Sequence, residues 1–381
     1  MIRVGPDGSD STTRRTLTGA ARLLAALQLD GPLLIGLGLV SCYGLIVLYS
    51  ASGQSMGTIL RTVMRIGLGT VAMLALAQLR PQQLRAAAPW VYAFGLLLLL
   101  VVDAMGVIGK GAQRWLDLGF IRFQPSEVMK LAVPMLCARY LHERPLPPTV
   151  PVMAVVAGII LLPAALTAAQ PDLGTAILII IGGLLLLVMA GLPVWYMIGG
   201  VALAAVAAWV GWHYLLHDYQ RNRVLTFIDP TTDPQGAGYH IIQSQIAIGS
   251  GGLFGKGWMN GSQSQLDYLP ERHTDFIFAV IGEEFGLLGL VILLALYLFV
   301  VMRALYLAAQ TQDTFSRLLS ASLALTFFVY VFINTGMVSG LLPVVGVPLP
   351  LVSYGGTSVV TLLAGFGILM ALYSHRKLVG S

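Results

Sequence analysis

Long apolar stretches, separated by short polar segments, follow one another along most of the chain. A membrane-spanning helix needs about 20 consecutive apolar residues, and ten stretches come near to that length. They lie close to residues 31–50, 61–79, 88–108, 126–142, 150–168, 173–190, 192–214, 276–302, 318–341 and 352–373. Because unpaired backbone groups are not tolerated in lipid, the pattern predicts an all-α polytopic membrane protein. The even number of spans places both chain ends on one side.

Composition supports this class of protein. Hydrophobic residues make up 57% of the chain and charged residues only 10%, with a mean hydropathy of +0.81. Soluble domains carry about 25% charged residues, so a soluble fold is excluded. The net charge of +5 is small, and we expect a membrane protein with no nucleic-acid partner.

The basic residues next to the spans predict the orientation, because cytoplasmic loops are enriched in Lys and Arg. Arg14, Arg15 and Arg22 precede the first span, and the basic residues after spans two, four, eight and ten fall on the same side. Both termini are therefore expected in the cytoplasm. Residues 1–25 read as a disordered cytoplasmic tail and residues 26–381 as a single transmembrane domain.

A second set of cations falls on the outer side. It consists of Lys110, Arg114, Arg122, Arg221, Arg223, Lys256 and Arg272. Long loops cross the membrane despite their charge, which is one explanation. The other is an outer basic surface that meets an anionic ligand.

One outer loop, about 215–275, is much larger than the others. Residues 236–248 are amphipathic, which is compatible with a helix lying along the membrane surface. Residues 249–257 are rich in glycine. Such a segment brings backbone amides close to an anion, although its glycine content alone favours a flexible connector.

Ionisable residues at membrane depth are costly and are functional candidates by default. Glu127 and Lys130 are three residues apart and share a helix face. We expect a buried pair, which either fixes helix packing or contacts a substrate. Lys110 and Arg114 are better candidates for holding phosphate. Asp172 is expected to cap the helix that follows it.

A charged segment precedes span eight. Its four ionisable residues are Glu271, Arg272, His273 and Asp275. Thr274 or Asp275 suits the N-cap of the span, whereas the other three residues are not needed for capping. Glu283 and Glu284 lie two turns further in, and at least one should face protein or water rather than lipid.

The last outer loop contains three prolines, Pro343, Pro348 and Pro350, which prevent a helix there. Irregular backbone at this depth must be buried in protein or line a cavity. Hydroxyls and glycine amides follow at the start of the last span, an arrangement that suits an anion. The residues concerned are Ser353, Tyr354, Gly355 and Gly356.

Together these motifs resemble the SEDS family (shape, elongation, division and sporulation) of polytopic peptidoglycan polymerases. The resemblance covers the chain from about residue 40 to its end. Arg272 and the run 261–265 are more similar to the elongation members of the family than to the division members. The segments that carry the resemblance are Lys110 to Trp115, Arg122 to Glu127, Gln170 to Gly174, Leu269 to Phe276 with Glu283 and Glu284, and Pro348 to Gly356.

The resemblance implies a glycosyltransferase of the bacterial cytoplasmic membrane that joins lipid II units into glycan strands on the outer face during cell elongation. The family's essential outer-loop aspartate falls on Asp275, and its paired acid and base fall on Glu127 and Lys130. A class B penicillin-binding protein, a single-span transpeptidase, is the implied partner.

This chemistry makes definite demands on the residues. An inverting transfer from an undecaprenyl pyrophosphate donor needs one base on the acceptor hydroxyl. We assign Asp275 to this role, with His273 as the competing base and Asp267 or Glu271 as a second carboxylate. Positive charge must meet the departing pyrophosphate; the candidates are Lys110, Arg114, Arg221, Arg223 and Arg272. A divalent cation (Mg²⁺ or Mn²⁺) is a possible cofactor, although the sequence shows no dedicated ligand set.

Two other functions fit the same spans. A lipid II flippase or transporter also uses broken helices and buried acids, with its key charges near the membrane midplane. A non-catalytic scaffold for a penicillin-binding protein would not need an acid at Asp275. The polar motifs all fall on one predicted face, which favours the enzyme and predicts that they meet around Asp275.

Overall fold

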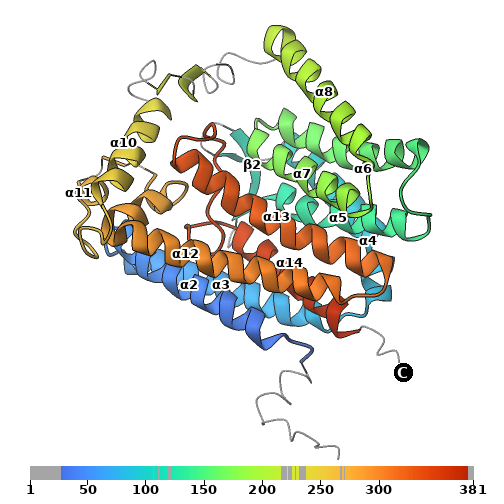
Figure 1. Ribbon diagram of the computed structural model, residues 1–381, viewed down its shortest axis with the longest axis horizontal. Helices are drawn as coiled ribbons and strands as arrows, with labels where there is room; N and C mark the ends of the chain where they lie inside the picture. Colours follow the sequence, from blue (N-terminus) through green and yellow to red (C-terminus); the bar gives the residue numbers. More distant parts are fainter. Residues whose placement is uncertain are drawn as a thin grey trace, which may run out of the picture.

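The structure is a computed structural model in which helices form most of the fold (Figure 1). It describes residues 27–105, 107–109, 112–117, 122–215, 221, 225–227, 229–230, 237–266, 268–269 and 271–375. The tail predicted at residues 1–25 lies outside this part of the chain.

The ten predicted spans correspond to ten described helices. Seven of these regions are long and apolar enough to cross a membrane, two more are shorter apolar helices, and α5 carries the predicted charged pair. The helices are α2 (Gly31–Ala51), α3 (Met56–Ala77), α4 (Pro81–Met105), α5 (Pro125–His142), α6 (Val150–Ala169), α7 (Leu173–Met189), α8 (Val194–Val210), α12 (Ile277–Ala309), α13 (Thr314–Val338) and α14 (Ser358–Ser374).

Smaller elements fill the connections. An antiparallel sheet with strand order β1-β2-β3 lies between α4 and α5, with Val107 opposite Trp115 and Leu116 opposite Phe123. The apolar pattern predicted no sheet here. The elements are β1 (Val107–Gly109), β2 (Ala112–Asp117), β3 (Arg122–Phe123), the π-helix η1 (Gly211–Leu215), α10 (Ala237–Ser250) and α11 (Ser262–Gln265).

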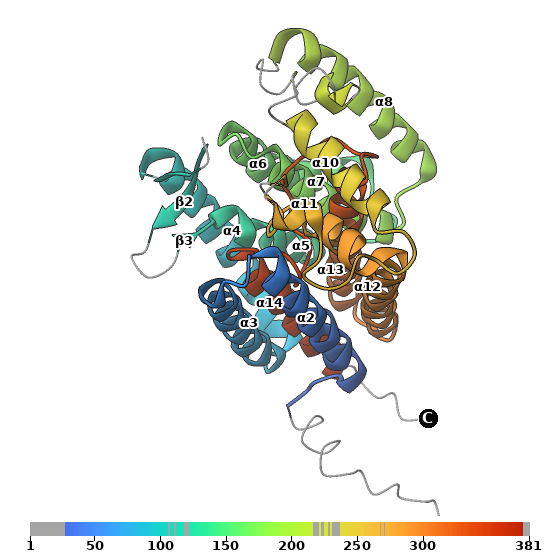
Figure 2. The ribbon, with the colours of Figure 1, turned by 90° about the vertical axis from the view of Figure 1, so that its left-hand side faces the viewer.

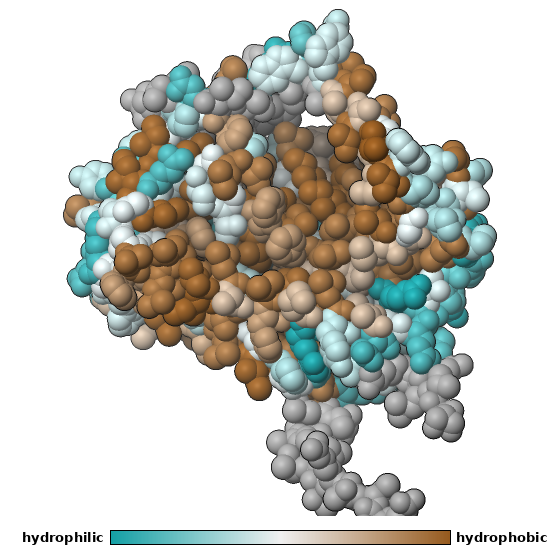
Figure 3. Space-filling view, in the orientation of Figure 1, coloured by the Kyte–Doolittle hydropathy of each residue, from teal (hydrophilic) through white to brown (hydrophobic). Residues whose placement is uncertain are grey.

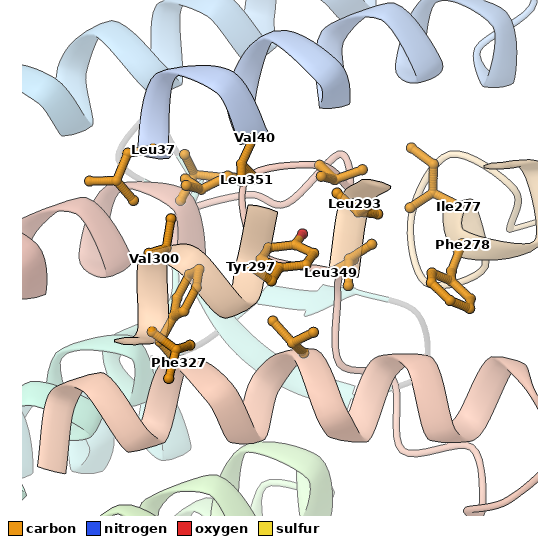
Figure 4. Packing of buried hydrophobic residues seen from close by; sticks show 14 of the residues in the cluster. Leu37, Val40, Ile277, Phe278, Leu293, Tyr297, Val300, Phe327, Leu349 and Leu351 are labelled. Carbon is orange, nitrogen blue, oxygen red and sulfur yellow. The ribbon is translucent and has the colours of Figure 1, made fainter. Parts of the chain in front are cut away.

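The second part of the proline-containing loop between α13 and α14, residues 347–355, is largely buried in protein, as irregular backbone at this depth requires. In Figure 4, Leu351 lies next to Val40 of α2 and Leu349 lies next to Tyr297 and Leu293 of α12, and both leucines are almost inaccessible. The hydroxyl of Tyr297 in α12 donates a hydrogen bond to the carbonyl of Pro350 at 2.6 Å. A Cβ atom at Gly44 of α2 would lie only 2.7 Å from the carbonyl oxygen of Leu351, so the loop packs directly against helix backbone.

Helix α8 stands apart from the other spans (Figures 1 and 2). None of the 18-residue apolar window in this region is buried, and Trp195, Val201 and Leu203 are exposed. Figure 3 shows the molecule hollowed between α8 and the rest of the bundle, with hydrophobic residues on the floor. Such a surface is stable only in contact with lipid or an apolar ligand.

Helix α12 is interrupted at Gly286, whose φ is +64° and ψ is −162°. The glycine-rich segment 251–258 binds at this interruption. The amides of Lys256 and Gly257 donate to the carbonyls of Glu283 and Glu284 at 2.9 and 3.0 Å; those of Leu287 and Leu288 donate to Gly252 and Leu253 at 2.9 and 3.1 Å. The segment therefore satisfies the backbone groups that the kink releases.

Candidate functional site

The segment before α12 forms turns from residue 271 to 276, and the N-cap of the helix is Phe276, without a side-chain cap bond. The predicted capping by Thr274 or Asp275 is wrong. The Thr274 hydroxyl instead donates to the Glu271 carboxylate at 2.6 Å, and the Phe276 amide donates to the Glu271 carbonyl. The turn thus satisfies its own polar groups, and Asp275 is not needed to start the helix.

Asp275 is half-buried between α13 and the last outer loop. The side-chain amide of Asn334 donates to the carbonyl of Asp275 at 2.9 Å and to the carbonyl of Val347 at 2.7 Å. Asn334 itself is fully buried. On the other side, a Cβ atom at Gly346 would lie 3.6 Å from Oδ2 of Asp275. One asparagine therefore fixes the backbone of Asp275 to the last outer loop, and the Asp275 carboxylate lies next to Gly346 of that loop.

His273 lies against the same loop. Its carbonyl accepts a hydrogen bond from the Tyr354 amide at 2.9 Å, and the two rings are 6.0 Å apart. The guanidinium of Arg65 in α3 lies over the Tyr354 ring, 4.6 Å from its centroid. The predicted meeting of segment 271–276 with the last outer loop is therefore confirmed, with Arg65 as an additional cation.

The turn that leads into α14 offers unused polar groups. Ser353 is used within the loop, since its hydroxyl accepts the Leu349 amide at 2.8 Å. By contrast, Thr357 is the N-cap of α14 but makes no side-chain cap bond. Its hydroxyl and Nη1 of Arg65 are buried without hydrogen-bond partners. An uncapped helix N-terminus beside a cation is an anion-binding arrangement.

A second cluster surrounds Asp172 between α6 and α7. The Asp172 carboxylate accepts the Thr175 amide at 3.2 Å, which confirms the predicted helix cap. It also accepts Gln124 at 2.7 Å and lies 3.6 Å from Nη1 of Arg114. A Cβ atom at the neighbouring Gly174 would collide with the carbonyl of Val345, so this cluster abuts the last outer loop.

The predicted pair in α5 is present and buried. Nζ of Lys130 lies 2.5 Å from Oε1 of Glu127, and the hydroxyl of Thr361 donates to Oε2 at 2.9 Å. The ammonium group also lies 4.9 Å from the centroid of the Tyr330 ring. A cavity of about 30 Å³ beside the pair has room for a water molecule or two but not for a sugar. In this conformation the pair is enclosed between α5 and α14.

Arg272 and the two glutamates of α12 tie the outer loop to α2. Arg272 donates to the carbonyl of Ala51 at 2.8 Å and to that of Ser264. Glu284 accepts the Ser50 hydroxyl at 2.5 Å. Glu283 pairs with Lys256 at 2.8 Å and also accepts two amides of α11. Both glutamates are buried in protein, as predicted.

The remaining candidates lie elsewhere. Arg221 donates to the carbonyl of His213 in η1, and Gly356 faces the Trp115 ring, 3.3 Å from where its Cβ would be. Lys110, Arg223 and Asp267 fall outside the described residues.

Among the residues that the structure describes, no group of three or more His, Cys, Asp or Glu side chains is placed to hold a metal ion. A dedicated metal site therefore does not fit this part of the chain.

The polar clusters all belong to connections that follow odd-numbered spans, or to the helix starts beside them, so they lie at the same end of the bundle. These features define a polytopic membrane protein with a candidate anion-binding and acid–base site at one membrane face.

The family model for cell cycle proteins of the FtsW, RodA and SpoVE type matches residues 31–378, and the chain belongs to this family.

Individual relatives agree with this assignment. The chain is 53% identical to the peptidoglycan glycosyltransferase MrdB of Escherichia coli (strain K12), covering 93% of this chain and 95% of that protein. It is 34% identical to the probable peptidoglycan glycosyltransferase FtsW of Geobacter metallireducens, covering 89% and 92%.

Solved structures show the same fold. One belongs to a peptidoglycan synthase complex described as coordinating polymerization and crosslinking; its TM-score is 0.82 at 33% identity, covering 92% of this chain and 98% of that chain. The crystal structure of Thermus thermophilus rod shape determining protein RodA gives a TM-score of 0.69 at 28% identity, covering 91% and 97%.

Proposed function

We propose that this protein is a peptidoglycan glycosyltransferase that polymerises lipid II, with Asp275 as the general base. The observation that carries the proposal is the position of Asp275, bound through Asn334 to the loop that also presents Tyr354 and the start of α14. The names of its relatives in Escherichia coli and Geobacter metallireducens support the reaction class.

In the proposed reaction, Asp275 accepts the proton of the acceptor 4-hydroxyl as that oxygen attacks the anomeric carbon of the donor sugar. A new C–O bond forms with inversion. The bond from the anomeric carbon to the pyrophosphate breaks, and its electron pair leaves with undecaprenyl pyrophosphate. No strong acid is needed for this leaving group. His273 remains the competing base, and its ring against Tyr354 places it next to the same loop.

We assign the pyrophosphate to the start of α14. The Thr357 hydroxyl and the Arg65 guanidinium each have a buried polar atom without a hydrogen-bond partner, and Arg114 lies nearby in β2, adjacent to the Trp115 ring that covers Gly356. Cations and helix amides placed where charge develops lower the barrier most effectively in a water-poor site. The lipid tail of the donor would occupy the apolar hollow beside α8 (Figure 3).

The proposed sidedness and partner follow from the same assignment. Both termini face the cytoplasm, and the site faces outward, where lipid II is polymerised. The partner is a class B penicillin-binding protein; this is supported by a structural relative that belongs to a complex coordinating polymerization with crosslinking.

The test is polymerisation of fluorescent lipid II by the purified protein with its partner. Asp275→Asn should reduce strand synthesis by at least about 100-fold, the usual contribution of a general base, with unchanged thermal stability. Equal yields from Asp275→Asn and wild type would remove Asp275 from the reaction; loss on His273→Gln instead would transfer the role to His273. Lipid II translocation in vesicles without polymer would favour a flippase.

A further inference from the structure

The glycine-rich segment 251–258 is bound to α12 through its backbone and turns its apolar side chains outward. Four backbone hydrogen bonds join it to α12 on both sides of Gly286. Leu253 and Phe254 nevertheless remain 64% and 79% exposed. A rigid loop that displays a leucine and a phenylalanine needs an apolar environment around those two side chains.

Two polar contacts between α2 and α12 show where this environment begins. At one end of the helices, Asp30 pairs with Arg303 at 2.6 Å; at the other end, Ser50 bonds to Glu284 at 2.5 Å. About 20 residues separate the two contacts along each helix, which at 1.5 Å per residue corresponds to about 30 Å. This matches the thickness of the hydrocarbon core, so we place its two boundaries at these contacts.

The segment 251–258 lies at the second boundary, because it binds α12 at residues 283–288. Trp258 contacts α2 just inside the same boundary: its indole nitrogen donates to the carbonyl of Ile46 at 3.2 Å, and its ring lies 6.0 Å from Tyr49. Tryptophan and tyrosine favour this level of the bilayer. The exposed side chains of Ile46, Leu287 and Leu288 continue the apolar surface from the segment onto the lipid-facing sides of the two helices.

We propose that residues 251–258 form an interfacial anchor, in which Leu253 and Phe254 insert into the lipid leaflet nearest to the polar site. The occupant is lipid rather than a protein because the segment lies at the hydrocarbon boundary and is continuous with the lipid-facing helix surfaces. The anchor is connected to the site through Lys256 and Glu283, which hold α11, and through Ser264 of α11, which binds Arg272. It keeps the outer loop at the level of the lipid headgroups.

Depth measurement on a spin-labelled protein tests the anchor independently of the proposed reaction. Cys42, which is exposed, is replaced by serine, and single cysteines are introduced as Leu253→Cys, Phe254→Cys and Leu266→Cys. Leu266 is the matched control, since its exposure of 64% equals that of Leu253 but it follows α11. Each protein is reconstituted in phosphatidylethanolamine and phosphatidylglycerol vesicles, and the accessibility of the label to oxygen and to a water-soluble nickel complex is compared.

Labels at residues 253 and 254 should be several-fold more accessible to oxygen than to nickel, with the ratio reversed at residue 266. Equal nickel accessibility at residues 254 and 266 would overturn the anchor. Shielding of residue 254 from both reagents, in vesicles that contain only this protein, would instead show a protein contact and would also overturn it. Loss of polymerase activity in an Asp275 variant with unchanged depths leaves the anchor intact, so the two proposals fail separately.

Discussion

Asn334 shows how one residue can position another across the sequence. Its side-chain amide uses both hydrogens, one on the carbonyl of Asp275 and one on that of Val347. Asn334→Ala would remove the side-chain donor to the part-buried carbonyl of Asp275 and to the buried carbonyl of Val347, at a cost of about 1–3 kcal/mol for each buried acceptor left unsatisfied, and would release Asp275 from the loop. We predict a kcat at least about 10-fold lower, equivalent to 1.4 kcal/mol of barrier, with KM for lipid II changed much less.

Thr335→Ala is the matched control for this prediction. Thr335 follows Asn334 in α13, and its hydroxyl bonds to carbonyls of the preceding turn of the same helix. It should lower neither kcat nor KM appreciably. A fall in stability for Asn334→Ala with an unchanged kcat in the folded fraction would show that Asn334 supports the fold but does not position Asp275.

The Glu127–Lys130 pair allows its two interpretations to be separated. Removing one partner of a buried pair leaves a buried charge and costs about 3–5 kcal/mol, whereas replacing both is often nearly neutral. Lys130→Met alone should therefore lower the melting temperature in detergent strongly, and Glu127→Gln/Lys130→Met should largely restore it. If the pair contacts substrate, the restored protein remains inactive; recovery of strand synthesis in the double variant would make the pair structural only.

At the scale of single residues, the sequence identified the buried charged residues but did not show which residues lie close together in the fold. Asp172, Glu127 and Glu283 stood out because a charged residue in an apolar chain requires a reason, and the structure buries all three with partners. Asn334 carries no charge and lies in an apolar run, so nothing marked it. Arg65 was not among the candidates, since its contact with Tyr354 depends on the packing of α3 against α14.

At the scale of elements, the interruption of α12 depends on close backbone contact. A Cβ atom at Gly255, whose φ is +78°, would collide with the carbonyl of Glu284. Gly255→Ala should therefore detach segment 251–258, making it sensitive to protease and lowering the melting temperature. Gly249→Ala is the control, because a Cβ there meets nothing within 4 Å. Identical proteolysis of the two variants would contradict the described packing.

Element prediction succeeded where one physical rule dominated. Lipid forces each spanning segment to be an apolar helix, so the spans were found. The start of the last span was placed too early, at residue 352 instead of Ser358, because Leu351 and Val352 are apolar but belong to the buried loop. The three-stranded sheet was missed because its pairing joins short segments whose apolar pattern is not distinctive.

For the whole molecule, the decisive property is that the described polar clusters lie at one end of the helix bundle. The connections that carry Asp275, Tyr354 and Asp172 lie at one end of the bundle, while the pair formed by Asp30 and Arg303 lies at the other. With Cys42 replaced by serine, a cysteine at Leu266 should react with a membrane-impermeant maleimide in intact spheroplasts. One at the exposed Gln312, in the α12–α13 turn, should react only after permeabilisation.

The labelling pattern bears directly on function, because lipid II is polymerised on the outer face and a flippase must expose its charges to both sides in turn. Modification at residue 266 from outside alone, unaffected by added lipid II, fits an enzyme whose site stays on one face. Labelling of residue 266 from inside would reverse the predicted orientation and place Asp275 away from its proposed substrate. Because α8 is the one described span without buried residues in its apolar window, we propose that the lipid tail enters from the bilayer beside α8, and the labelling tests whether the reacting sugars would then remain at the outer face.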